Sequence, residues 1–117
     1  DVVIGGSAGY ATTIFYQNTS EKFAQIPIPT AFLADTLCED MALLLFDADS
    51  DGDLDLYAGS GGYEHDAGSP AYQDRLYLND GKGNWTKAAE ALPKPGESSC
   101  AVRAADFDGD GLLDLFV

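Results

Sequence analysis

Basic residues are scarce in this sequence. Six Lys and Arg stand against twenty Asp and Glu in 117 residues, and the formal net charge is −14. Nucleic acids and anionic membrane surfaces attract lysine and arginine, so this shortage excludes both as main partners. Long apolar runs are missing too, since none approaches the roughly 20 residues of a membrane-spanning helix. We therefore expect no nucleic-acid binding and no direct insertion into a membrane.

Histidine and cysteine are almost absent. His65 is the single histidine, and the two cysteines, Cys38 and Cys100, fit no zinc or redox spacing. They can form one disulfide or remain two small buried thiols, and the spacing does not decide between these states. No nucleophile lies at a recognisable catalytic spacing from a histidine and an acid. The sequence therefore indicates that these residues alone form no enzyme.

Helix is disfavoured because Gly and turn-forming dipeptides interrupt most of the chain. Hydrophobic residues make up 45% of the sequence, which is enough for a packed core. Asn79–Asn84, rich in Gly and Asn, predicts a hairpin turn, and Thr30–Leu37 is a window that can form a helical turn. Short apolar segments bounded by turn residues predict strands at Ala42–Phe46, Leu54–Ala58, Arg75–Leu78 and Ala101–Ala105.

The chain repeats itself. The stretch FDADSDGDLDLY at Phe46–Tyr57 returns as ADFDGDGLLDLF at Ala105–Phe116, and DVVIGGSAGY at Asp1–Tyr10 is similar to DLYAGSGGY at Asp55–Tyr63. Weaker sequence similarities continue at the same spacing. A period in the fifties with several short segments in each unit predicts a repeat architecture, and propeller blades are among the candidates.

Nine of the twenty acids lie in two short stretches, where like charges repel unless a cation neutralises them. Acids occupy positions one, three, five and nine of each stretch, and a Gly at position six permits a sharp turn. Every second side chain of a loop coiled around an ion points inward, and position seven usually contributes its backbone carbonyl. Carboxylate oxygens suit Ca²⁺. The candidate ligand positions are Asp47, Asp49, Asp51, Asp53 and Asp55 in the first loop and Asp106, Asp108, Asp110, Leu112 and Asp114 in the second.

Two alternatives to this calcium interpretation exist. An acidic turn in solvent can use Asp for its turn propensity alone, but two matching loops in register between apolar strands favour a metal. An EF-hand shares the first half of the spacing and needs a bidentate acid at position twelve. That position is Ala58 in one loop and Val117 in the other. Since the flanks are also strand-like, the EF-hand is excluded.

The two loops and their surroundings resemble a known family. The motif D-x-D-x-D-G-x-x-D followed by an apolar strand is similar to the FG-GAP/VCBS repeats of integrin α-chain-like β-propellers. The stretches AADFDGDGLLDLFV, from Ala104 to Val117, and RLYLNDGKGNW, from Arg75 to Trp85, look like the bacterial and cartilage-acidic-protein branch of that family. The resemblance covers nearly the whole chain and is most specific in the two loops.

The resemblance implies an all-β fold of about two four-stranded antiparallel β-propeller blades with Ca²⁺-binding hairpin loops. Two Ca²⁺ sites are implied: Asp47, Asp49, Asp51 and Asp55 with the carbonyl of Asp53, and Asp106, Asp108, Asp110 and Asp114 with the carbonyl of Leu112. We expect a partial blade at 1–40, a full blade at 41–95 and the start of a third at 96–117. Because propellers close with four to eight blades, we also expect the chain to be a segment of a larger propeller, whose remaining blades are its partners.

The segment Gly61–Arg75 is an insertion relative to the first repeat. It carries Tyr63, His65, Tyr72 and Arg75, which are candidate ligand-binding residues because loops on a rigid sheet often bind ligands. Simple length variation explains the insertion equally well. His65 with a neighbouring acid is a poor general base, since adjacent side chains of one loop seldom converge.

Three hypotheses of function remain. The first is a secreted or cell-surface, non-catalytic module that binds Ca²⁺ and a protein or glycan ligand, as in cell adhesion, because extracellular Ca²⁺ is plentiful enough to fill such loops. The second is a secreted carbohydrate-active enzyme, a lyase or hydrolase, whose active site lies elsewhere in a parent chain. The third is a structural spacer. The sequence favours the first.

Overall fold

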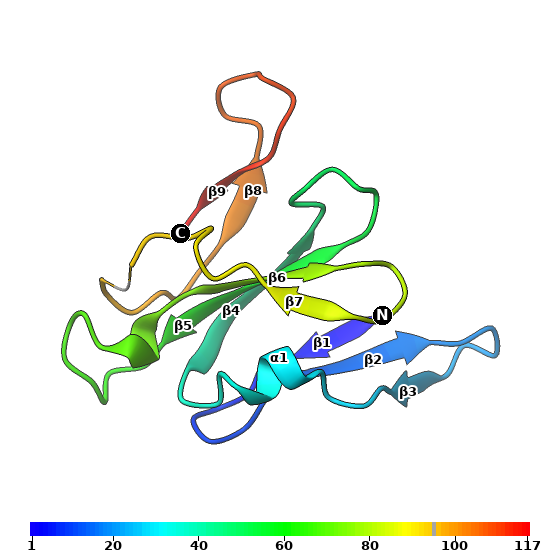
Figure 1. The fold of residues 1–117 in the computed structure, drawn as a ribbon, viewed down its shortest axis with the longest axis horizontal. Coiled ribbons are helices and arrows are strands. Elements are labelled where there is room, and N and C mark those ends of the chain that lie inside the picture. Colours follow the sequence, from blue (N-terminus) through cyan, green and yellow to red (C-terminus); the bar gives the residue numbers. More distant parts are fainter. Residues whose placement is uncertain (95) are drawn as a thin grey trace.

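A computed structural model describes residues 1–94 and 96–117, so Pro95, the last residue of the predicted full blade at 41–95, lies outside the described residues. The regular structure of the described chain is almost all β-strand, arranged in three antiparallel sheets (Figure 1). None of its helices is long and apolar enough to cross a membrane. The strands are β1 (Val2–Ile4), β2 (Thr13–Gln17), β3 (Phe23–Gln25), β4 (Glu39–Phe46), β5 (Asp55–Gly61), β6 (Arg75–Asn79), β7 (Trp85–Lys87), β8 (Arg103–Ala105) and β9 (Asp114–Phe116), with helix α1 at Thr30–Leu33 and a 3₁₀ turn at Pro70–Tyr72.

The middle sheet is a complete four-stranded meander in the order β4-β5-β6-β7. β4 pairs with β5 from Phe46 opposite Asp55 to Glu39 opposite Gly61, with one irregularity between Asp40 and Ala42. Every residue of β5 is buried, as expected for a strand with neighbours on both edges and sheets on both faces. The predicted hairpin turn connects β6 and β7.

The outer sheets are partial copies of the middle one. In the first sheet Ile4 pairs with Thr13, and in the middle sheet Ala58 pairs with Arg75 at the same point of the repeat. β1, β2 and β3 therefore correspond to β5, β6 and β7. The β8–β9 hairpin corresponds to β4 and β5, since Arg103 pairs with Phe116 as Leu44 pairs with Tyr57. The predicted fold class, all-β with propeller blades, is confirmed.

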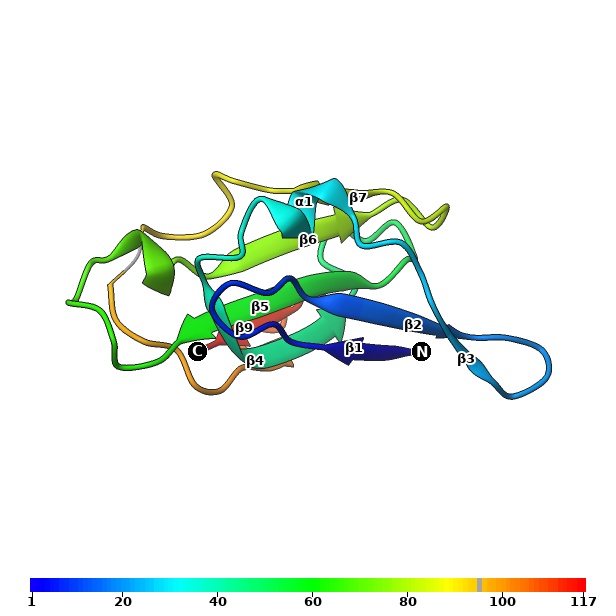
Figure 2. The same ribbon diagram turned by 90° about the horizontal axis from the view of Figure 1, so that it is seen from below.

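Apolar side chains fill the space between consecutive sheets. Phe32, on the short helix α1, packs edge-on against Tyr77 with 4.6 Å between ring centroids, and α1 lies beside β6 and β7 (Figure 2). A second cluster joins the middle sheet to the β8–β9 hairpin. The clusters comprise Ile14, Phe32, Leu56, Ala58, Tyr77 and Trp85 on one side and Ala42, Phe46, Tyr57 and Val102 on the other.

Candidate metal centre

The first acidic loop connects β4 to β5, and its carboxylates accept hydrogen bonds from its own backbone amides. The Asp47 carboxylate accepts hydrogen bonds from the amides of Asp51 at 3.2 Å and Gly52 at 3.1 Å. Gly52 has φ of +93°, a left-handed conformation that strains a residue with a Cβ. This glycine therefore permits the turn, as the spacing predicts, and the turn curls the loop back toward Asp47.

Asp55, the ninth residue of this loop, is fully buried. Its Oδ2 accepts a hydrogen bond from the amide of Ala48 at 2.8 Å, and its Oδ1 accepts one from the amide of Asn79 at 2.8 Å. A carboxylate that accepts two backbone N–H bonds is held rigidly. Asp55 therefore closes the loop and fixes it to β6 as well as facing the other acids.

Three carboxylates of the loop converge. Asp47, Asp49 and Asp55 each offer one oxygen, and these oxygens all lie within 4.8 Å of one another. Asp51 is turned differently, because its Oδ1 accepts the amide of Asp53 at 2.9 Å. The Asp53 side chain lies against the β6–β7 turn: a Cβ built on Gly81 would stand 2.2 Å from its Oδ2.

The second loop, between β8 and β9, repeats this arrangement. Asp106 accepts the amides of Asp110 at 3.1 Å and Gly111 at 3.0 Å, and Asp114 Oδ2 accepts the amide of Phe107 at 2.9 Å. Oxygens of Asp106, Asp108 and Asp114 lie within 4.8 Å of one another. The amide of Leu112 donates to Asp110 Oδ1 at 2.8 Å, as that of Asp53 does to Asp51. Two loops 59 residues apart therefore place the same three positions together.

The pKa of one acid of the first loop, Asp49, is shifted. The pKa of Asp49 lies above its ordinary value because of desolvation and then because of the neighbouring carboxylates of Asp51 and Asp55. A cation among these oxygens removes the repulsion. The converging donors are all carboxylate oxygens, a hard donor set that suits Ca²⁺ or Mg²⁺ and offers none of the nitrogen or sulfur ligands that zinc prefers.

The comparisons with known proteins point to one family. A family model described as an FG-GAP-like repeat matches residues 47–117, which is more than half of the chain and includes both acidic loops. The chain belongs to the FG-GAP-like repeat family. No curated protein and no solved structure matches the chain significantly.

The FG-GAP-like match confirms the resemblance found in the sequence. It begins at Asp47, the first position of the first acidic loop, and covers the strands that follow. The sheet β1–β3 lies outside the match, and its structural correspondence to the middle blade rests on the shared strand register described above. Family membership supports a propeller-type repeat module.

The insertion residues of this FG-GAP-like chain lie in two different environments. Tyr63 is 92% exposed, and His65 is exposed with its ring 5.9 Å from that of Tyr72. Tyr72 is buried, and its hydroxyl donates to the carbonyl of His65 at 2.8 Å. Tyr63 and His65 therefore face solvent, whereas Tyr72 holds the insertion in shape.

Arg75 does not face a ligand. Its side chain is 2% exposed, and one guanidinium nitrogen lies 2.6 Å from Asp40 Oδ1. Burial alone would lower the pKa of Arg75, but the Asp40 carboxylate together with Tyr77 and Cys38 outweighs it, and the pKa is raised. Arg75 begins β6 with a buried side chain, and Asp40 neutralises its charge inside the fold. This burial corrects the expectation that Arg75 belongs to a binding loop.

Proposed function

We propose that this chain is a Ca²⁺-binding FG-GAP-like repeat module that serves outside the cytoplasm as a non-catalytic binding unit for a protein or glycan ligand. The observation that carries the calcium part is the convergence of three carboxylates at equivalent positions of both loops. A single exposed acidic cluster would be weak support, but the same constellation twice, within a family repeat, is much stronger.

In this proposal Asp47, Asp49 and Asp55 hold one Ca²⁺, and Asp106, Asp108 and Asp114 hold the other. Asp51 and Asp110, with the carbonyls of Asp53 and Leu112, complete the sets. When bound, the ion supplies positive charge that cancels the repulsion of the loop carboxylates. The residues of the chain do the rest: Asp47 shapes the turn through its amide bonds, and Asp55 connects the loop to the sheet.

Location and partners follow from affinity and composition. Extracellular Ca²⁺ is plentiful enough to fill moderate sites, whereas cytosolic Ca²⁺ is scarce, so we place the module in the secreted or cell-surface space. The exposed Tyr63 and His65 offer an aromatic surface of the kind that binds protein or glycan ligands. His65 has no acid placed by a hydrogen bond among the described contacts, which fits binding better than catalysis.

Calorimetric titration of the metal-free chain with Ca²⁺ tests the calcium proposal. We expect two binding events, one for each carboxylate trio. Asp49→Asn and Asp108→Asn should each remove one event and leave the other. Asp66→Asn is the matched control, because this exposed acid in the insertion lies outside both loops and should leave both events unchanged. No heat or spectroscopic change with Ca²⁺ at millimolar concentration would overturn the proposal.

The binding proposal has its own test. The Ca²⁺-loaded chain is applied to a glycan array and to extracellular-matrix proteins, and retained glycans are analysed for cleavage. We expect retention without turnover, reduced by Tyr63→Ala. Cleavage of a glycan by this chain, abolished by His65→Ala, would contradict the non-catalytic interpretation and favour the carbohydrate-active enzyme.

A further inference from the structure

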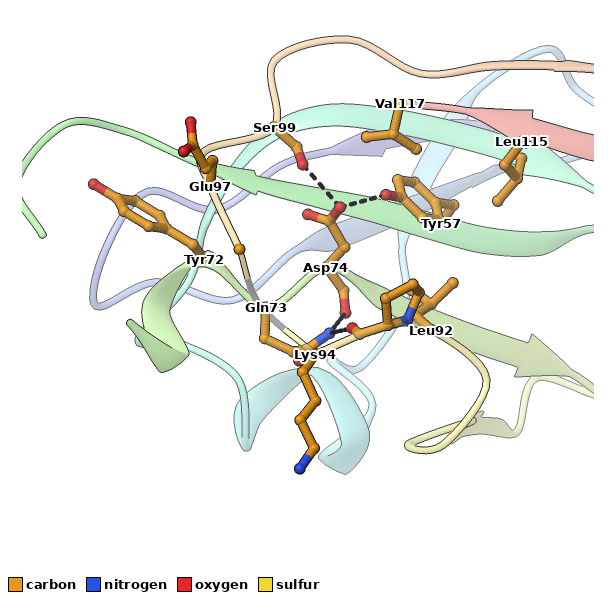
Figure 3. Close-up of a pocket in the computed structure, with 12 residues that line it drawn as sticks. Tyr57, Tyr72, Gln73, Asp74, Leu92, Lys94, Glu97, Ser99, Leu115 and Val117 are labelled. Atoms are coloured by element: carbon orange, nitrogen blue, oxygen red, sulfur yellow. Dashed lines mark hydrogen bonds between the residues drawn. The ribbon is translucent and has the colours of Figure 1, made fainter. Parts of the chain in front are cut away.

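The described blades meet at two junctions, and each junction contains one carboxylate bonded to one hydroxyl. At the first, Thr12 Oγ1 donates to Asp40 Oδ2 at 2.6 Å. At the second, Ser99 Oγ donates to Asp74 Oδ2 at 2.8 Å. Figure 3 shows the second pair, with Asp74 between Ser99 and Tyr57. Both pairs join residues far apart in the sequence and on different blades.

The four residues occupy only two positions of the repeat. Thr12 precedes β2 and Asp74 precedes β6, and these strands correspond in register. Asp40 and Ser99 correspond in the same way, since each lies four residues before a residue in the matching strands β4 and β8, Leu44 and Arg103. The hydroxyl is therefore on the preceding blade at the first junction and on the following blade at the second. The two partners have exchanged places.

The backbone around each pair is the same. The amide of Asp40 donates to the carbonyl of Gly6 at 2.9 Å, and the amide of Ser99 donates to the carbonyl of Ser60 at 2.8 Å. Gly6 and Ser60 are themselves equivalent, each five residues after one of the matching aspartates Asp1 and Asp55. The backbone amides of Gly6 and Ser60 also donate to the carboxylate of each pair. Gly6 N donates to Asp40 Oδ2 at 2.7 Å, and Ser60 N donates to Asp74 Oδ1 at 2.7 Å.

Each junction therefore needs a carboxylate, and either blade can supply it. Gly6 and Ser60 are buried, so an amide left without an acceptor there would be costly. Two hydroxyls would leave that amide poorly satisfied, and two carboxylates would repel each other at close range. Only mixed pairs satisfy both conditions.

We propose that these two positions form a hydroxyl–carboxylate clasp that determines which blades can follow one another. A blade with a hydroxyl before its third strand accepts a following blade that brings a carboxylate, and a blade with a carboxylate there accepts one that brings a hydroxyl. The two arrangements share the hydroxyl–carboxylate bond but differ in its neighbours, since Asp40 also pairs with Arg75 and Asp74 also accepts the Tyr57 hydroxyl. A mismatch destabilises the junction. The clasp is thus a specificity-determining interface within the repeat array, separate from the metal loops.

A swap at the second junction tests this proposal. The background is Tyr57→Phe, because the Tyr57 hydroxyl also donates to Asp74 and its counterpart at the first junction, Val3, has no hydroxyl. In this background Ser99→Asp places two carboxylates together, and Asp74→Thr places two hydroxyls together. The double variant Asp74→Thr/Ser99→Asp recreates at the second junction the hydroxyl–carboxylate order of the first, without the ion pair that Arg75 forms with Asp40 there.

We expect each single variant to lower the Tm of the full chain in Ca²⁺ and the double variant to recover most of the loss. Hydrogen exchange of the Ser60 amide should accelerate in Asp74→Thr and slow again in the double variant. Additive losses in Tm would overturn the proposal. If Asp74→Thr does not fold, the comparison is between Ser99→Asp and the double variant: a higher Tm for the double variant supports the clasp, and an equal or lower one refutes it.

Discussion

Asp55 accepts a hydrogen bond from the backbone amide of Asn79 at 2.8 Å, across the sheet from the loop that it ends. The preceding sheet contains the same bond, since Asp1 Oδ1 accepts the amide of Gln17 at 2.9 Å. The last aspartate of the motif is therefore part of the blade as well as of the loop. Any change in the loop that moves Asp55 also disturbs this bond to β6, so Asp55 links the acidic loop to the sheet.

This double role predicts an unequal response to mutation without metal. Asp55→Ala removes the acceptor of the backbone amides of Ala48 and Asn79, both half-buried residues. An unsatisfied amide costs about 1–3 kcal/mol when fully buried and less where water reaches it. Asp49→Ala removes an exposed carboxylate that repels its neighbours. In urea unfolding with chelator we expect a large loss of stability for Asp55→Ala and little or none for Asp49→Ala. Equal losses of stability would show that the hydrogen bonds that Asp55 accepts from the two backbone amides do not stabilise the metal-free chain.

Calcium should stabilise the fold. A ligand that binds only the native state adds about 2.7 kcal/mol at a concentration 100-fold above its Kd. We therefore expect the Tm to fall when Ca²⁺ is chelated and the fall to shrink in Asp51→Ala and in Asp110→Ala, the paired fifth positions of the two loops. The measurement is a thermal melt with Ca²⁺ and with chelator. A Tm that does not change on chelation would rule out a structural metal.

Much of this architecture could be predicted from local signals. Strands β4, β5, β6 and β8 follow from short apolar segments, the β6–β7 turn from its Gly and Asn residues, and the helical turn at Thr30–Leu33 from the Thr30–Leu37 window. The acidic loops could be predicted as candidate metal sites because all the candidate ligands of each loop lie within nine consecutive residues. The burial of Arg75 could not be predicted from the sequence, since its ion-pair partner Asp40 lies 35 residues away. The clasp escaped prediction for the same reason: Thr12 and Asp74 look unrelated until the register aligns them.

The Arg75–Asp40 ion pair gives a third prediction. Both side chains are 2% exposed, and removal of one partner leaves a buried charge, which costs about 3–5 kcal/mol. Arg75→Ala should therefore strongly destabilise the chain in urea unfolding. Lys87→Ala is the control, because the Lys87–Asp35 pair is also 2.6 Å long but leaves the lysine 32% exposed, and such pairs contribute about 1 kcal/mol or less. Similar losses of stability for both variants would mean that burial does not set how much an ion pair contributes to stability.

The β6–β7 turn predicts a pH dependence. The pKa of Asp80 lies below its ordinary value because its carboxylate accepts the Asn84 side-chain amide and the backbone amides of Lys82 and Asn84. A lowered pKa in the folded state means that these bonds stabilise the turn above the unfolded pKa and are lost as the pH falls through the folded one. Asn84→Ala should raise the pKa of Asp80 in a carboxyl ¹³C NMR titration. Lys82→Met should change that pKa less, since the lysine charge is the smallest of these influences; a larger shift with Lys82→Met would show that charge, not hydrogen bonding, sets it.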